Sequence, residues 1–387
     1  MNSLISKKLH ELNELNLSSP VIDKINMFDA FLVEESIKNN KRLNNPFYAS
    51  WNITNRCNTN CIYCINQVET ISLDEMTFEN KIETIIKLKN MGIKHIRLLG
   101  GEPSIVDGFN DIIKFILDND IYLSFSTNGF GINDNTINVL KNYSVYKYQI
   151  HVSLDSIVEK NNDRNRGYRS CRIALNAIDK LLSIENINLT VFSVFTKYTV
   201  KDILKTYDYM NRLKVPILGG VIPVKRGKAT DEMILPLTVD FLEDLIKVKI
   251  TSLNSFTEFF TSLGYEAVDN SILPKGVTKE MKEKSDIYFR TKCNSAVTRL
   301  HVESNGDFYP CDNLKFPEFN LGNCLDTEDI LTLWGHEKMN EIWSIRRLHK
   351  ENCNKCKHYY CSTGCMGLTY GEYGTLYKKD PNCKIII

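Results

Sequence analysis

The sequence of 387 residues has no long apolar segment, no surplus of charge and no repetitive tract. It has no run of 18 or more apolar residues that could cross a bilayer, and its opening, MNSLISKKLHELNELNLSS, lacks the apolar core and cleavage site of a secretory signal. The 48 Lys and Arg residues almost balance the 47 Asp and Glu residues, so the net charge is +1. We therefore expect a cytoplasmic protein with neither a membrane nor a nucleic acid as partner.

The unusual feature is a set of 12 cysteines in two separated groups. Three lie near the start, eight lie in the last quarter, and Cys171 stands alone between them. Cytoplasmic thiols stay reduced, so we expect metal-binding or catalytic cysteines rather than disulfides. Cys171 falls in a predicted helix, where we expect a small buried apolar residue.

The middle of the chain alternates short β-branched or aromatic runs with amphipathic stretches, a pattern typical of repeated βα units and a parallel sheet. The amphipathic stretches include residues 81–92, 109–120, 174–183 and 200–213, which we predict to be crossover helices. Periodicity alone leaves open a barrel, a partial barrel or a doubly wound sheet. The predicted strands cover residues 47–53, 93–99, 121–126, 148–154, 189–194 and 217–223.

Changes in composition divide the chain into four predicted parts. Residues 1–46 are a helical extension, 47–223 the βα part, 224–292 a polar and mainly helical connector, and 293–387 a small cysteine-rich α+β domain. The last part opens with TRLHV, SNGD and FYPC, which predict a β-hairpin.

The first cysteine group has the spacing CxxxCxxC, formed by Cys57, Cys61 and Cys64 directly after the first predicted strand. Three thiolates can hold a cubane iron-sulfur cluster and leave one iron open for another ligand. A zinc site would need a fourth, distant ligand, and this triplet alone leaves that alternative open.

Polar, glycine-containing segments follow the next predicted strands: LLGGEP after the second, STNG after the third and SLDS at the fourth. The carboxyl ends of parallel strands meet at one edge, where ligands bind. Each segment taken singly could be an ordinary turn. Their occurrence in register with the cysteine triplet favours one shared site.

Taken together, these motifs closely resemble the radical S-adenosylmethionine (SAM) enzymes. The resemblance implies a partial (β/α)6 barrel over residues 47–223 and a [4Fe-4S] cluster held by Cys57, Cys61 and Cys64, with SAM on the open iron. It implies reductive cleavage of SAM to a 5′-deoxyadenosyl radical that abstracts a substrate hydrogen.

The resemblance also implies contacts to SAM. Arg166 falls where the family often has an arginine that holds the carboxylate, although Arg164 is close by and a solvated loop arginine is the alternative. The implied SAM contacts are Tyr63, Gly100, Gly101, Glu102, Ser126, Asn128, Ser153, Asp155 and Arg166.

The carboxyl-terminal cysteines resemble the SPASM extension of radical SAM enzymes, with four residues where the family commonly has five between the CxxC pair and the next cysteine. The resemblance implies two auxiliary iron-sulfur clusters, and two zinc sites are the alternative. If Cys324 does not complete the first cluster, that cluster keeps an open iron. The implied ligands are Cys293, Cys311, Cys365 and Cys324 for the first cluster, and Cys353, Cys356, Cys361 and Cys383 for the second.

Asp312 follows Cys311, as in the anaerobic sulfatase-maturing branch of the family, where such an aspartate takes a substrate proton during oxidation. The resemblance implies a catalytic base, and a turn-capping aspartate is the alternative.

We therefore expect an anaerobic radical SAM oxidoreductase or maturase that modifies or cross-links a peptide or protein side chain. A flavodoxin or ferredoxin would supply electrons, and a separate partner could bind a leader peptide. Alternatives are a small-molecule dehydrogenase acting on an aminoglycoside-type alcohol, a sulfatase Cys or Ser maturase, and, from another class, a zinc-rich binding module.

Overall fold

The structure of the protein is a computed structural model. The predicted amino-terminal extension and the predicted connector lie almost wholly outside the residues that it describes. The described residues are 29, 32–33, 35–36, 39–66, 74–215, 217–221, 227–233, 293–345, 350, 353 and 364–381.

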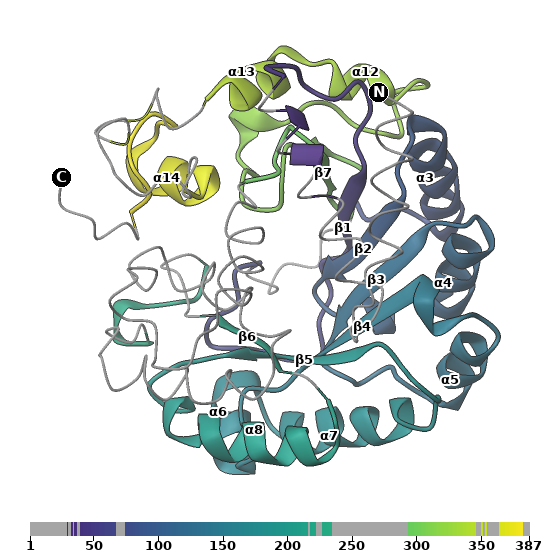
Figure 1. Cartoon of the computed structure of the whole chain (residues 1–387), viewed down its shortest axis with the longest axis vertical. Helices are drawn as coiled ribbons and strands as arrows, with labels where there is room; N and C mark the ends of the chain where they lie inside the picture. Colours follow the sequence, from purple (N-terminus) through teal and green to yellow (C-terminus); the bar gives the residue numbers. More distant parts are fainter. Residues whose placement is uncertain are drawn as a thin grey trace.

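The six predicted strands are confirmed, and they form one curved sheet. Each of the six is parallel to the next in sequence, and two further strands extend one edge, giving the order β6-β5-β4-β3-β2-β1-β7-β8. The order of β1 to β6 never reverses, so the sheet curls into a partial barrel instead of opening as a doubly wound sheet (Figure 1). The strands are β1 (Tyr48–Thr54), β2 (His95–Gly100), β3 (Tyr122–Thr127), β4 (Tyr148–Ser153), β5 (Leu189–Val194), β6 (Ile217–Val221), β7 (Arg299–Val302) and β8 (Phe308–Tyr309).

Helices cover the outer face of the sheet (Figure 1), and the four predicted crossover helices are confirmed as α3, α4, α7 and α8. The side chain of Thr77 caps the start of α3, and Gly92 ends this helix with a φ of 105°, a left-handed conformation that glycine adopts without strain. The helices are α3 (Phe78–Met91), α4 (Phe109–Asp118), α5 (Asp134–Lys141), α6 (Glu159–Arg166), α7 (Ser170–Leu181), α8 (Ile203–Arg212), α12 (Leu331–Trp334), α13 (Glu337–Ser344) and α14 (Met366–Tyr373).

The sheet has an apolar outer face and a polar inner face. On β1, Ala49, Trp51 and Ile53 are fully buried in the core beneath the helices. Ser50 and Asn52 alternate with them and are also buried. Hydrogen bonds across the inner face satisfy these two polar side chains. We call this polar inner face, built from alternate residues of the strands, the lumen.

The predicted hairpin is confirmed as β7 and β8, which pair antiparallel. It also joins the barrel, which the sequence does not predict: β7 lies parallel to β1, with Ser50 opposite His301 and Trp51 opposite Val302. Leu300 is 1% exposed and belongs to the same core as Trp51. The cysteine-rich part and the βα part therefore share one sheet and one core.

The same packing involves the residues just before β1. The guanidinium of Arg42 donates to the carbonyl of Trp334, 2.6 Å away, and the indole of Trp334 donates to the carbonyl of Leu43 at 2.9 Å. Within the described residues, no helix is long and apolar enough to span a membrane.

We predict that Leu300→Ala destabilises the whole barrel. The loss of a buried leucine should lower the free energy of unfolding by about 2–5 kcal/mol, measured by urea unfolding followed by circular dichroism. Leu325→Ala is the matched control, since Leu325 is 37% exposed and should barely change the midpoint. A Leu300 variant with an unchanged midpoint would contradict the shared core.

Candidate active site

The first cysteine group lies on the loop that follows β1. The hydroxyl of Thr59 is 3.2 Å from the Cys57 sulfur and 3.7 Å from the Cys61 sulfur. The amide of Cys64 donates to the carbonyl of Cys61 at 3.1 Å, which folds the loop back on itself. All three thiols are partly exposed. The loop therefore presents its sulfurs to one accessible region.

The surroundings of these thiols suit a multi-iron cluster. Burial raises the pKa of Cys57, and the nearby Glu102 and Cys64 raise it further. Burial also raises the pKa of Cys61, although Arg166 opposes this shift. Thiolates at this place therefore need added positive charge, which iron supplies. In the described part of the chain, no three Cys, His, Asp or Glu side chains are close enough to hold a single metal ion.

The glycines of the GGEP segment let it pack against the start of the cysteine loop. The amide of Gly101 donates to the carbonyl of Thr54 at 2.8 Å, and that of Glu102 donates to the carbonyl of Arg56 at 2.9 Å. A side chain on Gly101 would collide with the Arg56 carbonyl. Gly100 has a φ of 129°, and a side chain there would collide with Thr54. The two segments are therefore held in direct contact.

Glu102 joins the ends of β2 and β3. Its side chain is buried, and its Oε1 accepts from the hydroxyls of Ser104 (2.5 Å) and Thr127 (2.6 Å). Its Oε2 accepts from the backbone amide of Asn128 at 2.5 Å. These bonds occupy both carboxylate oxygens, so Glu102 positions the rim of the sheet through its carboxylate.

Asp155 is fully buried just after β4 and forms the centre of a second network. Its Oδ1 is 2.7 Å from Nη2 of Arg166 and accepts from the amide of Val194 at 2.9 Å. Its Oδ2 accepts from the hydroxyl of Tyr63 at 2.6 Å and from the side-chain amide of Asn165 at 3.0 Å. Three expected SAM contacts, Tyr63, Asp155 and Arg166, are thus brought together beside the cysteine loop.

Arg166 ends α6 and is 6% exposed, so the alternative of a solvated loop arginine is wrong. Its guanidinium lies 5.6 Å from the centre of the Tyr63 ring. Its Nε is buried and has no hydrogen-bond partner among the described residues. One donor of a fixed guanidinium is therefore free for a planar anion. Arg164, the competing candidate, instead lies 3.6 Å from the centre of the Tyr198 ring.

The remaining expected SAM contacts lie at the carboxyl ends of β3 and β4. Ser126, Asn128 and Ser153 are all partly exposed. The side chain of Asn128 donates to Asn58 of the cysteine loop at 2.8 Å. The rim that the motifs predicted is therefore assembled from the ends of four neighbouring strands.

Cys293, Cys311 and Cys365 form a second group, which we call the carboxyl-terminal thiols. Burial, with added contributions from Asp312 and Cys293, raises the pKa of Cys311 to about 12. Burial also raises the pKa of Cys365, with added contributions from Cys311 and Cys293. Cys293 thus acts on both of the other thiols, and a bound cation would favour their ionised forms.

Cys324 is not part of this group. It is fully buried in the core, where its sulfur lies 3.5 Å from the hydroxyl of Thr84 on α3. The side chain of Lys87, also on α3, donates to the Cys324 carbonyl at 2.9 Å. The structure therefore places the expected fourth ligand of the first auxiliary cluster against a helix of the barrel.

The other expected auxiliary ligands are only partly described. Cys353 is partly exposed, and Cys356, Cys361 and Cys383 lie outside the described residues. Cys171 is 2% exposed in α7, as expected of a buried apolar residue.

The two thiol groups lie at opposite ends of the lumen. The first group follows the carboxyl end of β1, and Cys293 precedes the amino end of β7, which runs parallel to β1. Cys311 follows β8, which runs back toward that same amino end. Six residue-to-residue steps lead from Tyr48 to Thr54, so the ends of β1 are about 20 Å apart.

Asp312 lies at the amino end of the lumen and forms an ion pair with Arg299. Its Oδ2 is 3.0 Å from Nη2 of Arg299. Burial would raise the pKa of Asp312, but Arg299, His301 and Lys315 together lower it to about 2. The carboxylate is therefore ionised at neutral pH and able to accept a proton, although its low pKa makes it a weak base.

Sequence analysis missed most of the lumen. Arg97 and Gln149 reach it from β2 and β4, and Arg299, His301 and Glu303 from β7 and its end. A signal was present: in HIRLL, YLSFS and YQIHVS, polar and apolar residues alternate. Such alternation indicates a strand with one polar face, whereas barrel strands are normally apolar on both faces.

Comparisons with known proteins agree with this geometry. Residues 51–210 match the radical SAM superfamily, and residues 293–358 match SPASM, an iron-sulfur cluster-binding domain. Mycofactocin maturase MftC of Mycobacterium ulcerans (strain Agy99) is 22% identical over 349 residues, 88% of each chain. Fe-coproporphyrin III synthase of Methanosarcina barkeri (strain Fusaro / DSM 804) is 29% identical over 350 residues, 86% of each chain.

The fold is also that of a solved structure. Streptococcus suis SuiB bound to precursor peptide SuiA superposes with a TM-score of 0.67 at 18% identity. The match covers 92% of this chain and 79% of the SuiB chain.

We predict that Asp155→Asn strongly destabilises the protein. The substitution leaves the buried Arg166 without its anion, which should cost about 3–5 kcal/mol in the free energy of unfolding. Urea unfolding measures the change. Asp134→Asn is the control, because Asp134 pairs with Lys180 on the surface and its loss should hardly move the midpoint. Equal midpoints for the two variants would refute a structural role for the Asp155 network.

Proposed function

Because the chain is a radical SAM enzyme with a SPASM domain, we propose that it abstracts a hydrogen atom from a peptide or protein side chain and produces an oxidative modification or cross-link. The cysteine-loop cluster and SAM, when bound, supply the 5′-deoxyadenosyl radical by reductive cleavage. The chain's own residues then have three tasks: to hold these groups, to position the substrate, and to accept the proton lost in oxidation.

The observation that carries this proposal is the rim at the carboxyl ends of β1 to β4. Cys57, Cys61 and Cys64 would hold the SAM-binding cluster. The contact between the Gly101 segment and this loop fixes the backbone that would face SAM. Arg166, held by Asp155, has a free Nε donor suited to the carboxylate of SAM. Preorganised donors of this kind need no rearrangement when the ligand binds.

We propose that the carboxyl-terminal cysteines hold two auxiliary iron-sulfur clusters, which accept electrons as the substrate is oxidised. Cys293 raises the pKa values of both Cys311 and Cys365, which supports one site. With Cys324 in the core, the thiolates described for this cluster number three, and a fourth ligand would come from outside the described residues or from substrate. Cys353, Cys356, Cys361 and Cys383 remain the proposed ligands of the second cluster.

A substrate in the lumen would lie between the two thiol groups. Asp312 would accept its proton, because the carboxylate is ionised and adjoins Cys311. Peptide substrates are supported by the maturases among the relatives and by SuiB, whose structure contains a precursor peptide. We further propose a flavodoxin or ferredoxin as electron donor and a separate protein that binds the leader of the peptide.

Oxidation of a small molecule is the second candidate. Fe-coproporphyrin III synthase, the relative at 29% identity, favours it, since a porphyrin is not a peptide. Coexpression of this enzyme with candidate peptides encoded beside its gene, followed by mass spectrometry, separates the two. A peptide mass change supports the first candidate, and none in any candidate peptide supports the second.

We predict that Cys57→Ala, Cys61→Ala and Cys64→Ala combined abolish formation of 5′-deoxyadenosine from SAM. Anaerobic reconstitution should give roughly three [4Fe-4S] clusters in the wild type and one fewer in this variant. Iron analysis and chromatography of the dithionite-driven reaction measure both. Two controls sharpen the test: Cys171→Ala and Cys324→Ala should keep the wild-type iron content, because both side chains are buried in the hydrophobic core. SAM cleavage that persists in the triple variant would disprove the site.

We predict that Asp312→Asn lowers product formation at least tenfold while 5′-deoxyadenosine still forms, because the asparagine cannot take the substrate proton. The coexpressed peptide identified by mass spectrometry serves as substrate. Arg299→Gln is the companion variant. It removes a charge that lowers the Asp312 pKa, so this pKa should rise and the pH profile of product formation should move to higher pH. Full activity of the asparagine variant would exclude Asp312 as the base.

A further inference from the structure

The lumen contains three cationic side chains among the described residues, and two of them have an acidic partner. Arg299 pairs with Asp312, and Lys315 lies 2.8 Å from Oε1 of Glu303. Arg97, on β2, makes no ion pair with any residue that the structure describes. The three cations therefore outnumber the two carboxylates that pair with them, although Arg97 also acts on Asp312 through its charge.

Arg97 lies in the middle of the lumen. Ser50 on β1 and Ser124 on β3 are its cross-strand neighbours. Its Nη2 donates to the hydroxyl of Ser126 at 3.3 Å, a long bond, and its Nε is buried without a partner. Arg97 precedes Gly100 by three residues, so it lies about 10 Å below the end of β2 that forms part of the rim.

Gln149 adds a second group with unused hydrogen-bonding capacity. It lies on β4 directly opposite Ser124, so Arg97, Ser124 and Gln149 are at one level of three consecutive strands. Gln149 is fully buried, and neither its Nε2 nor its Oε1 has a partner in the described structure. A buried amide without partners destabilises the folded state, so a ligand that forms hydrogen bonds with it would relieve that cost.

The groups around this level leave the charge available. The hydroxyl of Ser124 is already engaged with Nε2 of His95 at 2.7 Å, and His151 contacts Thr190 at 2.7 Å. Burial lowers the pKa of His95 to about 3 and that of His151 well below its usual range. Both imidazoles are therefore neutral, and they neither compete with Arg97 for an anion nor neutralise it.

We propose that Arg97 and Gln149 form a binding site for a carboxylate of the peptide substrate, held inside the barrel between the two thiol groups. A guanidinium and an amide N–H can both donate to one planar carboxylate. The Gln149 Oε1 then remains to accept an N–H from the adjoining peptide backbone. The carboxylate comes from an acidic side chain or from the carboxyl terminus of the peptide. This inference rests on the proposed peptide substrate.

Calorimetry on the anaerobically reconstituted holoenzyme with SAM tests the proposal without turnover. Three blocked peptides serve as probes: Ac-Ala-Asp-Ala-NH2 carries a side-chain carboxylate, Ac-Ala-Ala-Ala-OH a terminal one, and Ac-Ala-Ala-Ala-NH2 none. We expect one or both of the carboxylate probes to bind at least tenfold more tightly than the neutral probe. The tighter of the two identifies the source of the carboxylate.

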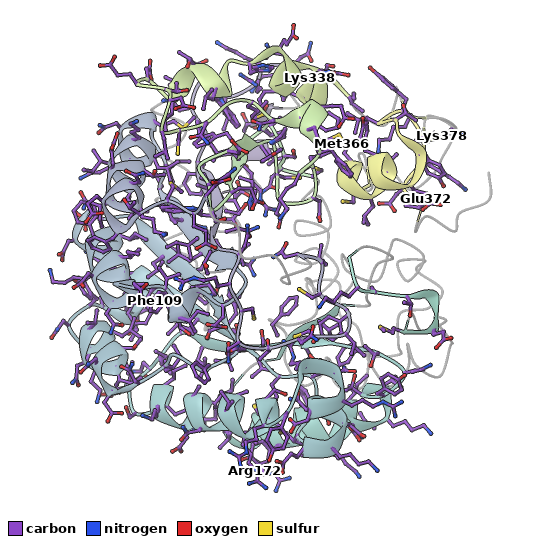
Figure 2. The ribbon with its side chains drawn as sticks, turned by 180° about the vertical axis from the view of Figure 1, so that it is seen from behind. Phe109, Arg172, Lys338, Met366, Glu372 and Lys378 are labelled. Carbon is purple, nitrogen blue, oxygen red and sulfur yellow. The ribbon has the colours of Figure 1, made fainter. Side chains whose placement is uncertain are left out.

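Variants assign the binding to this site. Arg97→Gln and Gln149→Glu should each weaken the preferred probe at least tenfold, the first by loss of charge and the second by repulsion, and Arg97→Lys should recover part of the loss. Arg172→Gln is the matched control, since Arg172 lies on the outer side of α7, 72% exposed (Figure 2), and should bind the probe like the wild type.

Three results would overturn the proposal. The first is equal binding of the charged and neutral probes. The second is wild-type peptide affinity in an Arg97→Gln variant that has normal iron content. The third is a loss of SAM affinity in Arg97→Gln as large as the loss of peptide affinity, which would assign the guanidinium to SAM. Failure of the proposed radical chemistry is a separate result, because it appears in SAM cleavage and product formation and leaves probe binding unchanged.

Discussion

Strand β1 hydrogen-bonds to β2 on one side and to β7 on the other, so that Ser50 and Leu300, 250 positions apart, meet in one sheet. All seven residues of β1 are buried, and the cysteine loop begins where the strand ends. Because β7 and its end bring Arg299, His301 and Glu303 to the lumen, the barrel gains charged groups that β1 to β6 do not supply. The relative placement of both thiol groups follows from this pairing.

The lumen shows how a buried polar surface is made stable. Each charged residue that β7 and β8 bring has a partner: Arg299 has Asp312, and Glu303 has Lys315, His301 and Asn52. Buried charges without partners are costly, so such pairing is required for the sheet to fold around them. The buried Nε of Arg97 and the side-chain amide of Gln149 are exceptions, because neither has a hydrogen-bond partner among the described residues.

The sequence predicted the elements of the fold well, because strand periodicity, helix periodicity and glycine turns depend only on residues that are close together in the chain. The CxxxCxxC loop and the GGEP segment were likewise readable from short spacings. The Asp155 network was not, since its bonds to Tyr63 and Val194 join positions that only the folded barrel brings together. The pairing of β7 with β1, and the burial of Cys324 against α3, depend on contacts between distant parts of the chain for the same reason.

The late position of β7 has a consequence for how the protein is made. A ribosome releases β1 to β6 well before it reaches Arg299, so the nascent sheet carries β1 as an open edge until β7 is made. An open parallel edge is a template for wrong pairing with other chains. Completion of the sheet must therefore await the synthesis of β7, and the lumen can receive no substrate in its final form before that strand has left the ribosome.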